Sequence, residues 1–421
     1  MALVRRTPDG ADGGGARRDL SPREAACAVA GRLADRGHVA YFAGGCVRDA
    51  LLKLEPADYD IATSATPEEI RAVFRSSRGV GESFGVNLIR LGGRTIEVAT
   101  FRSEGEYTDG RRPSHVTFSS AEADARRRDF SINGLFEDPR TGKVIDFVGG
   151  QADLAAGLLR AIDDPDRRMQ EDRLRTLRAA RFAARFSLKV DPVTEAAVVK
   201  YAPDLAGVSR ERVGVEFRRM MDHPSRSVAA ELIERWGLDA GCLGESNSTG
   251  PLVRLSGVGE VTPFFAALAA WRLDRAGRTP PAGSGAWHRA LMLSNRERDD
   301  FTSTLESVAA IDASWDASTV SARKRLAAQS TFAASLAIAA AANPDRGREV
   351  RAEVESLEGS HGGVAPDPFV TGHDLIAMGA VPGPLFKELL DSLYDAQLEG
   401  QVVTREEAHI RARSRLADVK N

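Results

Sequence analysis

The residue pattern of this chain changes at Gly149-Gly150. From residue 38 to that point, short apolar runs alternate with turn residues and short helical segments, a pattern typical of a mixed α+β domain. Beyond it, nearly all apolar positions recur at helical spacing. Because the chain has 421 residues, it exceeds the size of about 250–300 residues at which one hydrophobic core stops growing. We therefore predict an α+β fold in which a mixed-sheet head precedes an all-α remainder.

Changes in composition divide the chain further. Residues 1–19 are rich in Gly, Asp and Arg without an apolar period, which predicts a disordered tail. The parts predicted after it are a head, a helical neck, a helical body and a helical tail, at residues 20–149, 150–222, 223–345 and 346–421. Strongly helical segments are predicted at residues 173–186, 210–221, 263–272, 321–342 and 384–399. Ser21 with Glu24, and Thr66 with Glu69, predict capping boxes at two helix starts in the head.

Composition argues against several classes of protein. Every apolar run is shorter than the ~18–20 residues of a membrane span, and no signal peptide is recognisable, so we expect a cytoplasmic protein with no membrane partner. Cys27, Cys46 and Cys242 form no closely spaced pair, which argues against a disulfide framework and structural zinc. The net charge of −3 is unfavourable for a nucleic-acid partner, although only seven of the 57 cationic residues are lysines.

A glycine pair follows the first predicted strand, residues 39–43. Gly44 and Gly45 lead into a helical segment, where backbone N–H groups can approach a polyphosphate and Arg48 can bind the same anion. A Gly-Gly turn before a helix is more often only a turn, so this segment alone is a weak indication of phosphate binding.

Two acidic residues follow about ten positions later. If residues 58–62 form a strand, Asp58 and Asp60 point to the same side, and Mg²⁺ is the usual partner of two such carboxylates beside a phosphate. An isolated Asp-x-Asp is more often a solvated loop, but the preceding glycine turn favours the metal site. Glu97, on a predicted hairpin strand, is either a third carboxylate near the metal or a salt-bridge residue at the strand edge.

Two arginine-containing segments add possible ligand contacts. The consecutive arginines at 126–128 are typical of a solvated surface, yet beside a triphosphate one of them can bind phosphate or ribose oxygens. Asp172 and Arg175 are three residues apart on a predicted helix and therefore neighbours. A surface ion pair is the ordinary explanation. Alternatively, Asp172 as acceptor and Arg175 as donor match the amino group and ring nitrogen on the base edges of cytosine and adenine. Uracil and guanine present the reverse pattern and would be rejected.

Two further arginines, Arg178 and Arg181, wind around the same predicted helix away from Asp172, so we expect them to make other contacts.

Four segments together resemble a known family. GGCVRD, DYDIATSA, RRDFSING and EDRLRTLRAARFAAR have the order and approximate spacing found in class II tRNA nucleotidyltransferases, the bacterial CCA-adding enzymes of the DNA polymerase β-like superfamily. The resemblance is strong over residues 38–222 and weak through residues 293–298 and 371–384. It implies a nucleotidyltransferase head followed by helical neck, body and tail.

The family pattern implies roles for individual residues. Asp58 and Asp60 would be catalytic and hold Mg²⁺, and residues 103–114 fall where the family has a flexible loop that helps to switch from C to A addition. The implied nucleotide-binding residues are Gly44, Gly45, Arg48, Arg127, Arg128, Asp172, Arg175, Arg178 and Arg181, with Arg128 the better match of its pair. The helical tail would bind the tRNA elbow, with Arg405, Arg411 and Arg413 as candidates or, equally well, as a solvated helix face.

The implied activity is template-independent addition of C, C and A to the tRNA 3′ end from CTP and ATP, with release of pyrophosphate by a two-Mg²⁺ mechanism. Specialised A-adding and CC-adding enzymes and bacterial poly(A) polymerase stay open as alternatives. Residues 81–85 lack the basic signature usual in poly(A) polymerase, and a loop at 103–114 disfavours CC-only addition. A non-catalytic RNA-binding protein is disfavoured because both metal carboxylates are present. Neither an HD phosphohydrolase domain nor an oligomeric state is indicated.

Overall fold

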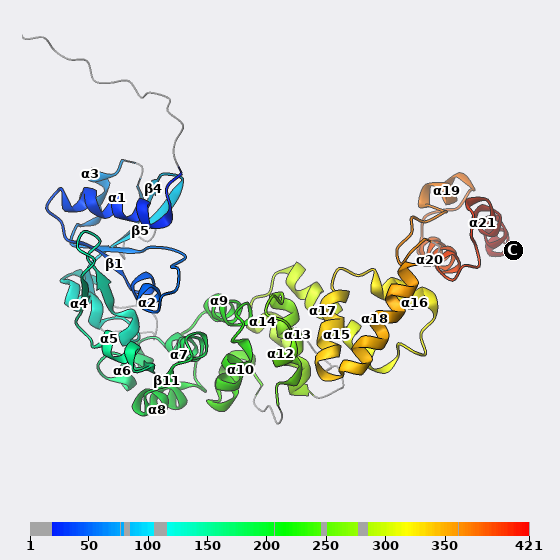
Figure 1. Ribbon diagram of the computed structural model, residues 1–421. Helices are drawn as coiled ribbons and strands as arrows, with labels where there is room; N and C mark the ends of the chain where they lie inside the picture. Colours follow the sequence, from blue (N-terminus) through cyan, green and yellow to red (C-terminus); the bar gives the residue numbers. More distant parts are fainter. Residues whose placement is uncertain are drawn as a thin grey trace, which may run out of the picture. The chain divides into compact units, whose positions relative to one another are not determined.

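The computed structural model describes residues 19–75, 77–79, 85–104, 116–205, 207–245, 251–276, 285–360 and 362–420 (Figure 1). Most of the predicted N-terminal tail, nearly all of the predicted flexible loop at 103–114 and all but the last residue of the segment at 81–85 lie outside these residues. The chain forms two compact units, one of residues 1–175 with 187–201, the other of residues 176–186 with 202–421. The finer division into neck, body and tail stays a prediction.

A seven-stranded mixed sheet is the centre of the first unit, in the order β3-β4-β5-β2-β1-β8-β9. Its strands are β1 (Ala40–Ala43), β2 (Ile61–Thr63), β3 (Arg78–Gly79), β4 (Val86–Leu91), β5 (Arg94–Thr100), β8 (Leu135–Glu137) and β9 (Val144–Asp146). β1 runs antiparallel to both neighbours, whereas β2 and β5 are parallel. β4 and β5 form the predicted hairpin. The predicted α+β class is thereby confirmed.

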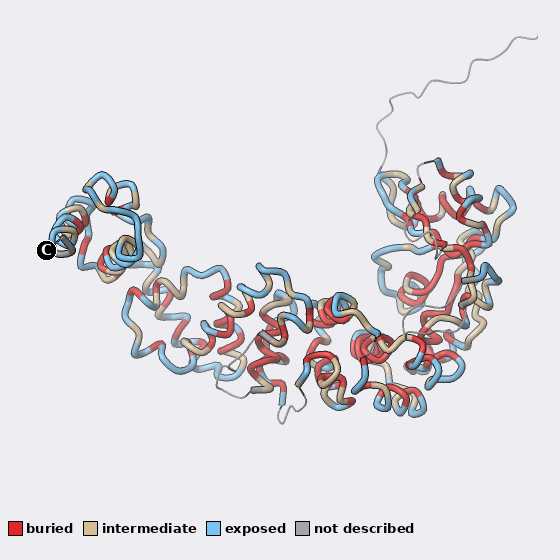
Figure 2. Tube along the Cα trace, turned by 180° about the vertical axis from the view of Figure 1, so that it is seen from behind, coloured by how far each residue is buried: buried red, intermediate tan, exposed pale blue. Residues whose placement is uncertain are grey.

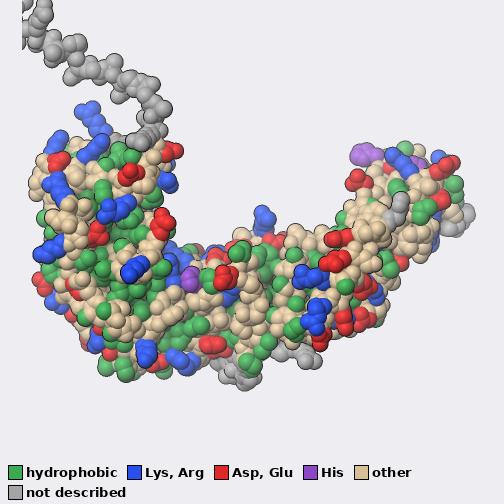
Figure 3. Space-filling model, viewed as in Figure 1, with side chains coloured by type: hydrophobic (Ala, Val, Ile, Leu, Met, Phe, Trp, Pro, Cys, Tyr) green, Lys and Arg blue, Asp and Glu red, His purple; other side chains and the backbone are tan. Residues whose placement is uncertain are grey.

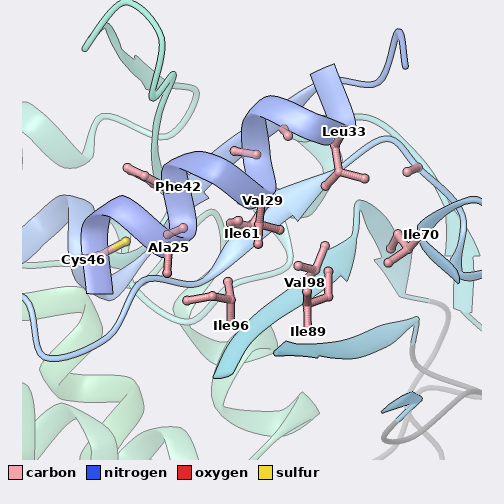
Figure 4. Close-up of a cluster of buried hydrophobic side chains, with 14 of the residues drawn as sticks. Ala25, Val29, Leu33, Phe42, Cys46, Ile61, Ile70, Ile89, Ile96 and Val98 are labelled. Atoms are coloured by element: carbon pink, nitrogen blue, oxygen red, sulfur yellow. The ribbon is translucent and has the colours of Figure 1, made fainter. Parts of the chain in front are cut away.

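Helix α1 (Pro22–Ala34) covers one face of this sheet (Figure 4). Its apolar side, including Val29 and Leu33, packs on Ile61, Ile89 and Val98 in one buried cluster. Each fully buried aliphatic side chain of this kind stabilises the fold by about 1.5–3 kcal/mol. The head helices are α1 (Pro22–Ala34), α2 (Gly45–Leu51), α3 (Pro67–Val73) and α4 (Ala121–Arg126). Both predicted capping boxes, at the starts of α1 and α3, are confirmed.

The first unit continues with mainly helical structure: a 3₁₀ turn (Ser131–Asn133), α5 (Gly150–Ala155), α6 (Pro165–Glu171) and α8 (Pro192–Tyr201). Short strand pairs also occur, β6 (Arg102–Glu104) with β7 (Val116–Phe118) in the head, and β10 (Leu158–Leu159) with β11 (Lys189–Val190) in the part predicted to be all-α. Helix α7 (Leu174–Arg185) begins at the end of the first unit and continues in the second.

The described part of the second unit is built from helices. They are α9 (Arg210–Met221), α10 (Arg226–Arg235), α11 (Leu238–Leu243), α12 (Val253–Gly257), α13 (Phe264–Ala276), α14 (Gly285–Ala290), α15 (Asn295–Ala313), α16 (Val320–Ala327), α17 (Phe332–Ala342), α18 (Pro344–Glu358), α19 (Gly372–Ala377), α20 (Pro384–Leu398) and α21 (Arg405–Lys420). The single helix predicted at 321–342 is wrong, because the polar residues Gln329, Ser330 and Thr331 separate α16 from α17.

Buried side chains follow the sheet of the first unit and the inner helix faces of the second (Figure 2). In the second unit, Trp271 packs against Trp287 with ring centroids 5.5 Å apart, and Trp287 stacks on Phe301 at 6.5 Å. Among the described helices, none is long and apolar enough to cross a membrane.

Candidate active site

The glycine turn after β1 brings an arginine close to the backbone. Gly44 has a φ of +69° and caps α2, and its N–H donates to the carbonyl of Leu135 at 2.9 Å. A β-carbon at Gly44 would lie 2.6 Å from Nη1 of Arg128. Glycine is therefore required here both for the left-handed backbone and for the approach of the guanidinium.

The two predicted metal ligands lie just before β2 rather than on it. Asp58 and Asp60 are exposed, and the carbonyl of Asp60 accepts a hydrogen bond from Ala43 N at 3.0 Å. In the parallel ladder of β2 and β5, Ile61 is opposite Val98, so the preceding pair is Asp60 and Glu97. Ile61 and Val98 are buried in the core, and alternation directs the two acids to the other side of the sheet.

Desolvation and neighbouring carboxylates raise the pKa of Asp60 and of Glu97. Desolvation by the surrounding protein, then the charges of Glu97 and Asp58, raise the pKa of Asp60 to about 7, and Arg128 acts in the opposite direction. Desolvation and Asp58 likewise raise the pKa of Glu97, which is partly opposed by Arg102. Such mutual repulsion is relieved by protonation or by a cation bound between the acids.

In the described part of the chain, no three His, Cys, Asp or Glu side chains are arranged as a ready metal cluster. The donor chemistry nevertheless fits a divalent cation, because Asp58 and Asp60 supply hard carboxylate oxygens and the pKa of Asp60 is raised by desolvation and then by neighbouring negative charge. Glu97 contributes to that charge.

The three consecutive arginines have different environments. Arg126 is exposed and pairs with Glu122 and Asp163. Arg127 and Arg128 instead converge on the buried carboxylate of Asp124, at 2.7 and 3.0 Å. Burial alone would raise the pKa of Asp124, but the two guanidiniums lower it. Asp124, a buried anchor for two predicted ligand residues, was not anticipated.

Arg48 belongs to a buried hydrogen-bond network. Its guanidinium donates to the side-chain oxygen of Asn133 at 2.5 Å and to Asp49 at 2.6 Å. The backbone carbonyl of Asn133 in turn accepts from Arg128 at 3.1 Å, and its amide donates to Asp129 at 3.0 Å. Asn133 thus joins the two arginines predicted to bind the nucleotide. It lies inside the quoted RRDFSING segment, the only sequence signal that pointed to it.

The prediction that Asp172 and Arg175 share one helix is wrong. Asp172 has an extended backbone (φ −147°, ψ 101°) at the end of α6, and its carboxylate accepts from the N–H of Leu174, the first residue of α7, at 3.1 Å. Asp prefers such a position because its short carboxylate caps free N–H groups at a helix start. Arg175 still lies nearby, because its N–H donates to the carbonyl of Asp172 at 2.9 Å.

Arg175 is buried, with 6% of its surface exposed. Its guanidinium donates hydrogen bonds to acceptors in α6 and in the arginine segment at 126–128. Nη1 donates to Glu171 Oε2 and to the carbonyl of Arg168, both at 2.9 Å, and Nη2 donates to the carbonyl of Arg127 at 3.1 Å. The structure therefore connects the segment predicted to read the base with the segment predicted to meet the phosphates. Glu171, the central acceptor, was not singled out from the sequence.

Arg178 and Arg181 make other contacts, in the second unit. Both reach the buried Glu216 of α9, at 3.6 and 2.7 Å, and both guanidiniums lie over the ring of Phe182, at 5.0 and 4.2 Å. Glu216 was not anticipated either. Their roles as nucleotide ligands stay predictions.

Of the arginines predicted to bind tRNA, Arg405 pairs with Asp374 at 3.1 Å, Arg411 donates to Gln401 at 3.1 Å, and Arg413 is exposed. On the face of the first unit seen in Figure 3, cationic and acidic side chains are interspersed, so the net charge of −3 does not describe a uniformly acidic surface.

Known protein families and solved structures match this chain in sequence and in fold. Residues 40–160 match the "Poly A polymerase head domain", and residues 187–240 match the "Probable RNA and SrmB- binding site of polymerase A". The solved CCA-adding enzyme of Bacillus stearothermophilus, in complex with CTP, is 28% identical, with a TM-score of 0.76 over 95% of this chain and 99% of that one. Together these matches indicate a class II tRNA nucleotidyltransferase.

The chain also matches curated relatives. The CCA-adding enzyme of Leuconostoc mesenteroides is 42% identical over 205 residues, and that of Bacillus subtilis is 41% identical over 204 residues. Each match covers 48% of this chain and 51% of the relative. The chain therefore matches about half the length of these curated relatives. A Thermotoga maritima CCA-adding enzyme complexed with tRNA has the same fold, with 19% identity and a TM-score of 0.66 over 94% and 97% of the two chains. The family predicted from four motifs is confirmed.

Proposed function

We propose that this chain is a cytoplasmic enzyme that adds C, C and A to the 3′ end of tRNA, using CTP and ATP and releasing pyrophosphate. The observation that carries the proposal is the acidic group of Asp58, Asp60 and Glu97 on one face of the sheet near the start of β2, with Arg128 held nearby against Gly44. Nucleotidyl transfer requires carboxylates that can bind a divalent cation and, beside them, a fixed guanidinium that can bind phosphates. The family membership supports the same reaction class.

Asp58 and Asp60 are the residues we expect to hold Mg²⁺. When bound there, the cation would neutralise triphosphate charge and favour attack by a hydroxyl group. The donor set supports this assignment, because a divalent cation would stabilise the ionised form of Asp60, which desolvation and the charges of Glu97 and Asp58 disfavour.

The chain's own contribution is positioning and charge stabilisation. In the proposed reaction the tRNA 3′ oxygen forms a bond to the α-phosphorus while the bond from that phosphorus to the pyrophosphate oxygen breaks. Arg128, fixed by Asp124 and by the Asn133 carbonyl, would meet the incoming triphosphate, with Arg127 beside it. Gly44 and Gly45 leave room for the phosphates, and Arg48 supports this region through Asn133.

Base choice is proposed to depend on Asp172 as acceptor and Arg175 as donor. Cytosine and adenine present an amino group beside a ring-nitrogen acceptor, which suits this pair, whereas uracil and guanine present the reverse pattern. Arg178 and Arg181 are proposed to support nucleotide binding, and Arg405, Arg411 and Arg413 to bind tRNA phosphates.

The test is a magnesium-dependent incorporation assay with the purified full chain. tRNA transcripts that end at the discriminator base, at C or at CC are each offered one labelled nucleotide triphosphate at a time. We expect CC addition from CTP, one A from ATP on the CC-ended transcript, and no reaction with UTP or GTP. Long A tails would indicate a poly(A) polymerase, and arrest after CC or addition of A alone would indicate a specialised enzyme. Asp60→Ala, which is expected to abolish incorporation, serves as the control for contaminating activity.

A further inference from the structure

One main-chain carbonyl in the first unit accepts hydrogen bonds from two arginines. The carbonyl of Arg127 accepts from Nη2 of Arg175 at 3.1 Å and from Nη1 of Arg168 at 3.5 Å. Arg127 precedes Arg128, the arginine proposed to meet the triphosphate. The backbone of that segment is therefore fixed from the side of α6 and the start of α7.

The same two arginines share a carboxylate oxygen. Oε2 of Glu171 lies 2.8 Å from Nη1 of Arg168 and 2.9 Å from Nη1 of Arg175. The carbonyl of Arg168 also accepts from Nη1 of Arg175 at 2.9 Å, and Nε of Arg168 donates to the carbonyl of Ile162 at 3.2 Å. Of the acceptors described for the Arg175 guanidinium, one is the carbonyl of Arg168 itself. The other two, Glu171 Oε2 and the Arg127 carbonyl, also accept hydrogen bonds from Arg168.

Burial and charge limit the arrangements that this cluster can adopt. Arg168, Arg175 and Glu171 are all buried, so each has lost most of its water. Burial and the neighbouring charge of Arg175 lower the pKa of Arg168, while Glu171 raises it. Two buried guanidiniums around one carboxylate tolerate few arrangements, because every hydrogen bond that is lost leaves a buried donor unsatisfied. A planar guanidinium held at several points also has a fixed orientation.

We propose that Arg168 is a positioning residue for nucleotide choice. By sharing the Glu171 oxygen and the Arg127 carbonyl with Arg175, it sets the plane of the Arg175 guanidinium, and selection of C and A over U and G depends on that plane. Arg168 acts through Arg175 and is not assigned a contact with the nucleotide. This inference rests on the proposed function, in which Arg175 reads the base edge.

The adjacent residue provides a matched control. Arg167 contacts the same carboxylate, with Nε 3.0 Å from Oε1 of Glu171, but its side chain is 69% exposed. It has the same charge, lies on the same helix and contacts the other oxygen. Replacing Arg167 therefore removes one positive charge at Glu171 without removing an acceptor of Arg175 or a donor to the Arg127 carbonyl.

The experiment compares Arg168→Met, Arg168→Lys and Arg167→Met with the unaltered chain. The readout is the ratio of kcat/KM for CTP over UTP on tRNA ending at the discriminator base, and for ATP over GTP on tRNA ending in CC. We expect Arg168→Met to lower both ratios by at least about tenfold, Arg168→Lys to lower them less, and Arg167→Met to change them by less than about twofold. Arg168→Met combined with Arg175→Ala should be no less selective than Arg175→Ala alone, because both act through one guanidinium.

Unchanged ratios in Arg168→Met, with only a lower overall rate, would overturn the inference, as would an equal loss in Arg167→Met. Should Arg168→Met fail to fold by circular dichroism, Arg168→Lys decides, because it keeps the charge but cannot span the two acceptors. Failure of the proposed function is distinguishable, because the unaltered chain itself would then fail to add CC from CTP and a single A from ATP.

Discussion

Asp60 and Glu97 lie next to each other because β2 and β5 run in parallel with Ile61 opposite Val98. The two carboxylates are far apart in the sequence. Desolvation, then the nearby charges of Glu97 and Asp58, raise the pKa of Asp60 to about 7. This arrangement has a measurable consequence for stability.

Without a divalent cation, Asp60 should destabilise the fold as the pH rises. The pKa of Asp60 is 3.8 in the unfolded chain and about 7 in the folded chain, so the folded state binds the proton more tightly. The stability that this proton provides is complete below pH 3.8 and is lost as the pH rises towards 7. Asp60→Asn removes this contribution. We expect it to melt at a higher temperature than the unaltered chain at about pH 8, and at a similar temperature near pH 4, in thermal denaturation followed by circular dichroism.

Saturating Mg²⁺ should raise the melting temperature of the unaltered chain at about pH 8 and have little effect on Asp60→Asn. Parallel pH profiles for the two proteins would contradict the carboxylate repulsion described above.

Gly44→Ala should weaken nucleotide binding through Arg128. The new methyl group would meet Nη1 at 2.6 Å and displace the guanidinium, in addition to straining a backbone with φ +69°. We expect KM for CTP and ATP to rise by about tenfold or more in steady-state incorporation. Gly37→Ala is the control, because Gly37 has φ +88° and nothing within 4 Å. It should cost about 1 kcal/mol of stability and leave KM unchanged, so a similar rise in KM there would exclude the steric explanation.

Asp124→Asn should loosen both Arg127 and Arg128. Loss of the buried charge removes the ion pairs at 2.7 and 3.0 Å, and the free energy of unfolding should fall by about 1.5–3 kcal/mol in urea denaturation. KM for both nucleotides should rise while the preference for CTP over UTP stays, because Arg175 keeps its acceptors. Glu122→Gln, which affects only the exposed pair with Arg126, should alter neither quantity. A change in base preference in Asp124→Asn would be inconsistent with this division of roles.

Glu216→Gln should destabilise the second unit. Glu216 is 2% exposed and lies 2.7 Å from Arg181, which is also buried, so its removal leaves an uncompensated buried charge. The expected loss is about 3–5 kcal/mol of unfolding free energy, measured by urea denaturation. Arg219→Ala removes an exposed partner of the same carboxylate, 3.5 Å away, and should cost less than about 1 kcal/mol. Equal losses from the two variants would show that burial does not govern this cluster.

The local features of the fold followed from residues close together in the chain. The capping boxes at Ser21 and Thr66 depend on a contact between residues three apart, and the Gly44 turn depends on two consecutive glycines. Such interactions form wherever the segment is placed, because both partners are already adjacent. The paired acids Asp58 and Asp60 were recognised for the same reason, and four such segments in order were enough to predict the family.

The partners of the buried charges depended instead on the tertiary structure. Arg175 was expected to face Asp172 along one helix, yet the chain turns between α6 and α7, and the guanidinium is held by Glu171 and by the Arg127 carbonyl, 48 residues away. Asn133 and Glu216 likewise received their distant partners, Arg48 and Arg181, only on folding. A buried charge binds the acceptors and donors that the packed fold brings within about 3 Å, and residue spacing carries no information about those partners that lie far apart in the chain.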